Sequence, residues 1–293
     1  MKSILLTGGN GFIGKNLLPA LGARYRVLAP SRAELDLLDA VAVRAWFEAH
    51  PVDAIIHSVV QPGHRNAATV ANQLERNCRM FFNVTRNVSA SQRFLFLGSG
   101  AVYDLPRLPP KVDENFFDTW VPADEHGFSK YIAAKQIERH SNMVELRLFG
   151  VFGPHEDYAI RFISNAICKA LCRLPITCRM NRRFDYLYVG DLAGILGRFI
   201  ERGWGHPAYN VTPDQSMELV QIAELVREIT GADVPIQVAE KGLGPEYSGA
   251  NTRLRAQIPD LVLTPIRDAI TRLVVWYRGN LHTIDRAKLL LDR

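Results

Sequence analysis

The fold of this chain is decided by the stretch KSILLTGGNGFIG, which runs from Lys2 to Gly14. Its apolar half predicts a buried strand, and three glycines spaced three residues apart follow at once. Glycine at these positions lets the backbone turn tightly and approach a pyrophosphate at the N-terminus of the next helix. The stretch therefore predicts a strand, turn and helix that bind a dinucleotide. The predicted contacts are Gly8, Gly11, Phe12, Ile13 and Gly14.

Downstream of this loop, short apolar runs alternate with helical patterns. Such alternation predicts an α/β fold with a doubly wound parallel (Rossmann) sheet, which binds ligands at the carboxyl ends of its strands. The predicted strands are Ile4–Thr7, Arg26–Ala29, Ala54–His57, Phe94–Gly98 and Val144–Leu148. Proline and glycine interrupt the second half, which predicts shorter elements there. We expect a dinucleotide-binding domain over 1–152 and a smaller, mainly substrate-binding α/β lobe over 153–293, from which about 184–200 returns to the first domain.

Composition and charge narrow the class of protein. Of the 293 residues, 47% are hydrophobic and 22% charged, as in a soluble globular protein. No apolar run reaches membrane-spanning length and no signal peptide is recognisable, so we expect a cytoplasmic protein without a membrane partner. The net charge of +5 is scattered, with no basic run longer than Arg182-Arg183. This distribution disfavours nucleic acid and favours an anionic small molecule as partner.

The 4 cysteines do not indicate a metal centre. Cys168 and Cys172 would share a helical face and Cys178 follows, but no further His or Cys completes a ligand set. We therefore predict buried thiols and no metal.

The loop after the second predicted strand bears on the choice of cofactor. It reads Ala29-Pro30-Ser31-Arg32 and lacks, at its tip, the acidic residue that would hold the ribose 2′-hydroxyl of NAD. A hydroxyl followed by a guanidinium suits the 2′-phosphate of NADP. We predict NADP, with Ser31 and Arg32 as contacts. The alternative is NAD, with Arg32 as a solvated loop cation.

Several segments along the rest of the chain follow one another in a distinctive order. They are Leu35–Asp39, His57–Val60, Leu97–Tyr103, Leu146–Pro154, Arg183–Asp191 and Tyr209–Val211. Together with the glycine loop they resemble the extended short-chain dehydrogenases/reductases that act as sugar-nucleotide epimerases, dehydratases and reductases, most closely the GDP-L-fucose synthase branch. The resemblance implies an NAD(P)-dependent enzyme with a nucleotide-sugar substrate. It also implies a homodimer formed through helices that would include Leu74–Val88 and Gly127–His140.

The resemblance assigns roles to individual positions. It implies further cofactor contacts at Asp36, Leu37, Val59 and Val60. Ser99 would be the catalytic serine, whose hydroxyl can donate to a carbonyl oxygen from the carboxyl edge of a strand, and Gly100 would contact substrate. The alternative for Ser99 is a turn serine between two glycines.

The family's catalytic pair is a Tyr four residues before a Lys, and here the pair is His126 and Lys130. In the family the Lys holds the nicotinamide ribose, and a spacing of four places both side chains on one helical face. Histidine is a workable general acid near neutrality because its ordinary pKa is about 6.5. A literal Tyr-x-x-x-Lys follows at Tyr131 and Lys135, but five residues of helix rotate a side chain by about 140°. We expect Tyr131 to point away from the cofactor.

Two further departures from the family concern epimerisation. The Cys that the fucose-synthase branch uses falls at Ala101, and its partner His falls at Arg161. Epimerisation at carbons 3 and 5 is therefore unsupported. For the substrate diphosphate and nucleoside, the predicted contacts are Asn165, Arg183 and Arg253, because Arg can bind phosphate bidentately. The alternative for each Arg is a surface salt bridge.

Two functions of different class follow. The first is an NADP(H)-dependent reductase or epimerase that transfers hydride to or from a nucleotide-activated 4-keto sugar. The second is a regulatory or binding module that holds the cofactor without turnover. Position 126 separates them, because it decides whether a proton can be exchanged.

Overall fold

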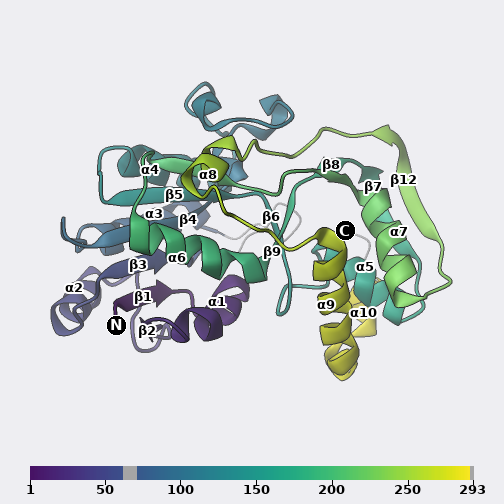
Figure 1. Cartoon of the computed structure of the whole chain (residues 1–293), viewed down its shortest axis with the longest axis horizontal. Coiled ribbons are helices and arrows are strands. Elements are labelled where there is room, and N and C mark those ends of the chain that lie inside the picture. Colours follow the sequence, from purple (N-terminus) through teal and green to yellow (C-terminus); the bar gives the residue numbers. More distant parts are fainter. Residues whose placement is uncertain (62–70, 291–293) are drawn as a thin grey trace.

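The computed structural model describes residues 1–61 and 71–290, and a parallel sheet lies at its centre (Figure 1). Six strands lie side by side in the order β2, β1, β3, β4, β5, β10. Their bounds are β1 Ser3–Thr7, β2 Arg26–Leu28, β3 Ala54–His57, β4 Arg93–Ser99, β5 Met143–Leu148 and β10 Ala208–Val211. All neighbouring pairs are parallel. The predicted parallel sheet is confirmed, and five of its strands lie where the sequence predicted them.

Helices cover both faces of this sheet, which explains its continuous apolar strands. In β1, Ile4 and Leu6 pack with α1 and α6 on one face, whereas Leu5 packs with α2, α3 and α4 on the other. These residues are fully buried. The helices are α1 Phe12–Gly22, α2 Ala40–Ala49, α3 Gln73–Thr85, α4 Glu125–Ile137 and α6 Leu192–Arg202. We call the sheet with these helices the first lobe.

A second lobe forms around its own apolar core. Three helices, α5 Phe162–Leu171, α7 Leu219–Thr230 and α9 Ile266–Gly279, pack together there with α10 Arg286–Leu289. Strand β7 Ile176–Asn181 pairs in parallel with β12 Ile236–Leu243. Two short pairs join the lobes: β6 Gly150–Phe152 with β9 Tyr186–Tyr188, and β8 Arg183–Phe184 with β11 Met217–Glu218.

The chain returns from the second half to the sheet more than once. Helix α6 packs on the sheet through Leu192 and Phe199, and β10 pairs with β5. Helix α8, Thr252–Gln257, contributes Leu254 to the same core. From the sequence, β10 and α8 are expected in the second lobe, because a four-residue apolar run and a six-residue helix carry too little periodicity to be placed.

The prediction that the cysteines are buried is wrong for most of them. Cys168 is buried, whereas Cys78, Cys172 and Cys178 are half-buried, and all are free thiols. Among residues 1–61 and 71–290, no group of three His, Cys, Asp or Glu side chains could hold a metal ion. Over the same ranges, no helix combines the length and the apolar character needed to cross a membrane.

Candidate active site

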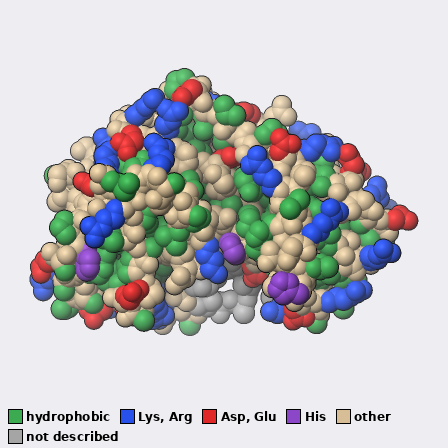
Figure 2. Space-filling model, turned by 60° about the horizontal axis from the view of Figure 1, so that its bottom comes forward, with side chains coloured by type: hydrophobic (Ala, Val, Ile, Leu, Met, Phe, Trp, Pro, Cys, Tyr) green, Lys and Arg blue, Asp and Glu red, His purple; other side chains and the backbone are tan. Residues whose placement is uncertain are grey.

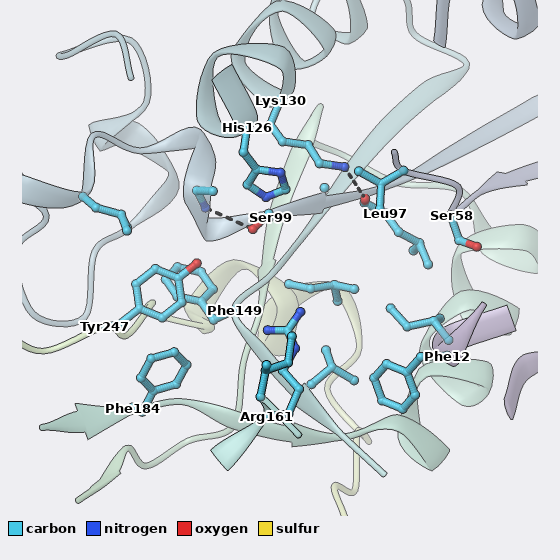
Figure 3. Close-up of a pocket in the computed structure, with 18 of the residues that line it drawn as sticks. Phe12, Ser58, Leu97, Ser99, His126, Lys130, Phe149, Arg161, Phe184 and Tyr247 are labelled. Atoms are coloured by element: carbon cyan, nitrogen blue, oxygen red, sulfur yellow. Dashed lines mark hydrogen bonds between the residues drawn. The ribbon is translucent and has the colours of Figure 1, made fainter. Parts of the chain in front are cut away.

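A cavity of about 420 Å³ opens at the carboxyl ends of β1, β3 and β4, between the two lobes. Figure 2 shows the molecule hollowed between the lobes on one face, where basic and acidic side chains are interspersed. The lining side chains include, from the first lobe, Phe12, Ile13, Ser58, Val60, Ser99, His126 and Lys130. Beyond β5 they include Phe149, Arg161, Arg182, Phe184 and Tyr247 (Figure 3). Several residues predicted from the sequence therefore meet in one place.

The glycine loop at one end of the cavity has the shape of an anion cradle. Gly8 has a φ of +78°, which residues with a side chain rarely adopt. Its carbonyl accepts a hydrogen bond from the Gly11 amide at 2.9 Å. A Cβ at Gly14 would lie 2.6 Å from the Gly9 Cα, so only glycine lets α1 approach the loop this closely. In the described structure no side chain caps the first turn of α1. Its amide groups are thus suited to a pyrophosphate.

The predicted 2′-phosphate contacts, Ser31 and Arg32, have acidic neighbours. Arg32 is exposed and pairs with Asp36 across 3.4 Å. Glu34 accepts a hydrogen bond from the Ser31 amide at 2.7 Å, and this bond lowers the pKa of the Glu34 carboxyl. A 2′-phosphate at this position would replace Asp36 as the partner of Arg32.

The other predicted cofactor contacts differ in whether their side chains are buried or face the cavity. Leu37 is buried in the core, and its carbonyl accepts from Asn83 Nδ2 at 2.9 Å. Val59 packs on the same core, whereas Val60 is exposed and lines the cavity. Of these, Val60 is the side chain that faces the cavity.

Ser99 is the last residue of β4 and lines the cavity. Its Oγ accepts a hydrogen bond from the Ala101 amide at 3.1 Å, which fixes the side chain at the start of a short 3₁₀ turn. Because that bond uses a lone pair, the hydroxyl hydrogen points elsewhere and can be donated. The predicted role of Ser99 as a donor to substrate is compatible with this geometry.

Helix α4 presents His126 and Lys130 to the same cavity (Figure 3). The helix starts there because Asp124 Oδ1 accepts from the Gly127 amide at 2.9 Å. Lys130 is buried; its Nζ donates to the Leu97 carbonyl at 3.3 Å and lies 4.4 Å from the centre of the Phe96 ring. Burial lowers the pKa of Lys130 to about 8, and the charge of Glu145 partly opposes this shift.

Tyr131 lies outside the cavity, as expected from its helical position. Its hydroxyl donates to Asp118, which also accepts from Lys135 Nζ at 2.9 Å. Its ring packs against Phe117 at a centroid distance of 5.4 Å. Between the two candidates for proton transfer, the structure presents the histidine to the cavity.

A buried carboxylate beneath this site was missed from the sequence. Glu145 on β5 is fully buried, and its Oε2 accepts from Arg147 Nε at 2.8 Å. The carboxyl group lies against Gly98, where a Cβ would be 2.6 Å from the Glu145 Cγ. The signal was a pair of charged residues inside the otherwise apolar run of β5.

Within the part of the chain that the structure describes, the arginines that line the cavity are Arg161 and Arg182, not the predicted Arg183. Arg183 points away and forms an ion pair with Glu218 at 3.5 Å. Neighbouring residues of an extended chain face opposite sides, so Arg182 and Phe184 share the cavity side.

Two other predicted substrate contacts are also directed elsewhere. Arg253 donates to Asn115 Oδ1 at 2.8 Å, and Asn165 donates to the Tyr158 carbonyl at 3.0 Å. Gly100 is buried beneath Phe149 and Tyr247 and is not among the lining residues. None of these three residues is among those that line the cavity in the described structure.

The sequence of this chain is similar to those of known proteins. Residues 4–212 match the model of the NAD dependent epimerase/dehydratase family. The chain is 26% identical over 257 residues to a GDP-L-fucose synthase of Azorhizobium caulinodans, covering 78% of this chain and 81% of the relative. A GDP-L-colitose synthase of Yersinia pseudotuberculosis is 23% identical over 257 residues, covering 78% and 82%.

The fold is shared with solved structures. A GDP-mannoheptose C4 reductase from Campylobacter jejuni, with NADP bound, superposes with a TM-score of 0.80 over 94% of this chain and 98% of that chain. Sequence identity is 18%, so this likeness concerns the fold.

Proposed function

This chain belongs to the NAD dependent epimerase/dehydratase family, and from that premise we propose that it is an NADPH-dependent reductase of a nucleotide-activated 4-keto sugar. The observation that carries the proposal is the meeting of Ser99, His126 and Lys130 at the cavity edge next to the glycine loop. A hydroxyl donor, a proton donor and a buried cation are the groups that a carbonyl reduction requires.

The cofactor site fits a dinucleotide, because glycine at positions 8 and 14 keeps the loop open at the start of α1. When bound there, NADPH supplies the hydride. The choice of NADPH over NADH is supported by Arg32 and by the NADP bound in the structure of the Campylobacter relative. Lys130 would hold the nicotinamide ribose, since its Nζ lies at the carboxyl end of β4 on the Leu97 carbonyl.

The proton is assigned to His126. A reduction turns a carbonyl oxygen into a hydroxyl, so one proton must reach that oxygen as negative charge develops on it. The imidazolium of His126 can deliver this proton from α4, while Ser99 Oγ–H steadies the oxygen from β4.

The nucleotide end of the substrate is assigned to the second lobe. Figure 3 shows the Arg161 guanidinium directed into the cavity, and Arg182 also lines this cavity. Two guanidinium groups are suited to a diphosphate, whose oxygens accept bidentate hydrogen bonds. Reduction is favoured over epimerisation because Ala101 and Arg161 offer no acid–base pair for inverting a sugar carbon.

Turnover of NADPH tests this proposal. The purified chain is mixed with NADPH and a panel of GDP-, CDP- and UDP-linked 4-keto-6-deoxy sugars, and absorbance loss is followed with and without each sugar. We expect sugar-dependent oxidation with at least one of them. Cofactor binding by calorimetry without any oxidation would instead support a binding module.

The proposal includes the oligomeric state and the cellular compartment. We assign the chain to the cytoplasm, as a homodimer formed through α3 and α4. The dimer is supported by Phe128 and Tyr131, which are only half-buried on α4 with ring centroids 6.3 Å apart. Sedimentation at micromolar concentration tests it: a mass near 66 kDa is expected from the chain mass of 32.9 kDa. A mass of one chain would contradict it.

A further inference from the structure

A phenol from the second half of the chain reaches the catalytic side of the cavity. Tyr247 lies between β12 and α8, far in sequence from the residues of the first lobe that line the site. Its ring packs against Phe149 and Phe184 with centroid distances of 4.8 Å and 4.8 Å. In Figure 3 its hydroxyl is directed toward the side of the cavity that holds Ser99.

The Tyr247 hydroxyl lies in the space that the absence of a side chain at Gly100 leaves open. A Cβ at Gly100 would lie 2.7 Å from Tyr247 Oη and 2.7 Å from Phe149 Cε1. The phenol thus occupies the volume that any side chain at position 100 would take, directly after Ser99. Glycine at this position is what admits the hydroxyl to the site.

The backbone around Tyr247 is held firmly. The Tyr247 amide donates to the Arg183 carbonyl at 2.9 Å, and the Tyr247 carbonyl accepts from the Asp185 amide at 3.1 Å. The buried Asp185 carboxylate also accepts from the Gly249 amide at 2.8 Å and from Lys111 Nζ at 3.0 Å. This clamp sets the phenol against the cavity before substrate enters, which is the condition for a preorganised donor.

We infer that Tyr247 is a further catalytic residue: its hydroxyl and that of Ser99 donate hydrogen bonds to the same carbonyl oxygen of the keto sugar. The inference rests on the proposed function. In the step, a C–H bond forms at the carbonyl carbon with hydride from NADPH, and the π electrons of the C=O bond move to oxygen. The two hydroxyls bind that oxygen while His126 transfers its proton to it, giving the alcohol and NADP⁺.

The division of roles follows from the two groups. A phenol O–H can donate a hydrogen bond and keep its proton, whereas imidazole is the usual group for proton transfer in catalysis. Tyr247 is therefore suited to donating a hydrogen bond, and His126 to giving up a proton.

The substitution Tyr247→Phe tests the inference, because it keeps the ring between Phe149 and Phe184 and removes the hydroxyl alone. Loss of one oxyanion donor lowers kcat by about 10²- to 10³-fold in a comparable site, and we expect a loss of that order with NADPH affinity unchanged. Tyr186→Phe is the matched control. Its ring stacks on Phe184 at 4.9 Å, but it is not a lining residue, so kcat should stay within about twofold, the change expected where no catalytic donor is lost.

Two outcomes distinguish a failure of the inference from a failure of the proposed function. If the unaltered chain reduces a keto sugar and Tyr247→Phe keeps its kcat within about twofold, the phenol is not a catalytic donor. If the unaltered chain turns over no sugar, calorimetry with NADP⁺ and the 4-hydroxy nucleotide sugars decides. The phenylalanine variant should then bind the sugar about 3- to 10-fold more weakly, the worth of one hydrogen bond, and equal affinities would contradict the inference.

Discussion

At the residue scale, the chemistry depends on which side chain stands at position 126. A histidine there faces the cavity, and the phenol of Tyr131 on the same helix is bound to Asp118 outside it. We expect His126→Ala to lower kcat by about 10²- to 10⁴-fold, the usual worth of a general acid, with little change in NADPH affinity. Tyr131→Phe is the control and should leave kcat near that of the unaltered chain. Equal turnover by both variants would remove His126 from the mechanism.

Glu145 gives a second prediction at this scale, through the charge of Lys130. Lys130 has a pKa of about 8 because burial disfavours its charged form, and Glu145 acts in the opposite direction. If the charged lysine is the active form, turnover falls as pH rises through about 8. Removing the carboxylate charge lowers the pKa of Lys130 further, so Glu145→Gln should move this fall to lower pH.

The pH profile of kcat/KM measures that shift. Glu156→Gln is the control, because Glu156 is also buried with a pKa near 8 but lies in the second lobe, away from Lys130. It should leave the alkaline limb in place. An alkaline limb that moves with Glu156 and not with Glu145 would contradict the assignment to Lys130.

Individual residues show how far the sequence could lead. The resemblance to the family's catalytic pair implied His126 and Lys130, and their spacing of four residues is compatible with one face of α4. Arg182 was not predictable, because a shift of one residue in an extended strand exchanges the cavity side for the outer side. Tyr247 was not either, since its place depends on how the second lobe meets the first.

At the scale of elements, the turn from β1 into α1 is the part of the fold that the sequence determined most closely. Gly14→Ala would place a Cβ 2.6 Å from the Gly9 Cα, so helix and loop must separate. We expect loss of most NADPH affinity, measured by fluorescence or calorimetry. Gly22→Ala, at the other end of α1, meets no atom within 4 Å and should bind NADPH normally. Similar affinity in both variants would show that the cradle does not hold the cofactor.

The loop after β2 tests the choice between the two nicotinamide cofactors. Among the described residues Arg32 pairs with Asp36, whose side chain is partly exposed, so a 2′-phosphate can take its place. Arg32→Ala should weaken NADPH by about tenfold, as expected for one charge-assisted contact, and leave NADH nearly unaffected. Arg44→Ala, on the exposed side of α2, is the control for lost positive charge. Equal effects of Arg32→Ala on both cofactors would point to NAD.

Elements of the first half were predictable because each strand is a continuous apolar run between helices, as burial on both faces requires. β10 was not, because it has only the residues Ala208–Val211 and gains its place by pairing with β5. Such pairing depends on the sheet that is already formed and leaves little trace in the local pattern.

At the scale of the whole molecule, stability should depend on a buried carboxyl in the second lobe. Burial raises the pKa of Glu156 from 4.5 to about 8, although Ser164 Oγ donates to it at 2.6 Å. The folded chain thus keeps a proton that the unfolded chain releases above about pH 4.5. The free energy of unfolding should therefore fall as pH rises from about 5 to about 8, and level off above that.

Urea unfolding between these pH values measures the slope. Glu156→Gln cannot ionise, so its stability should decline less over this range than that of the unaltered chain. The exposed Glu48→Gln serves as control and should keep the slope. Parallel curves for Glu156→Gln and the unaltered chain would show that Glu156 is ionised in the fold.

Residues of both lobes line one cavity. In the proposed reaction, residues of the sheet side handle hydride and proton, and residues of the other side hold the nucleotide sugar. Hydride transfer is the claim on which this account depends. The direct measurement uses NADPH that carries deuterium at C4 of the nicotinamide, with the panel of nucleotide-linked 4-keto sugars and mass spectrometry of the products. The account predicts one deuterium on the former carbonyl carbon of a sugar, lost in His126→Ala. Bound NADPH with no deuterium in any sugar would contradict it.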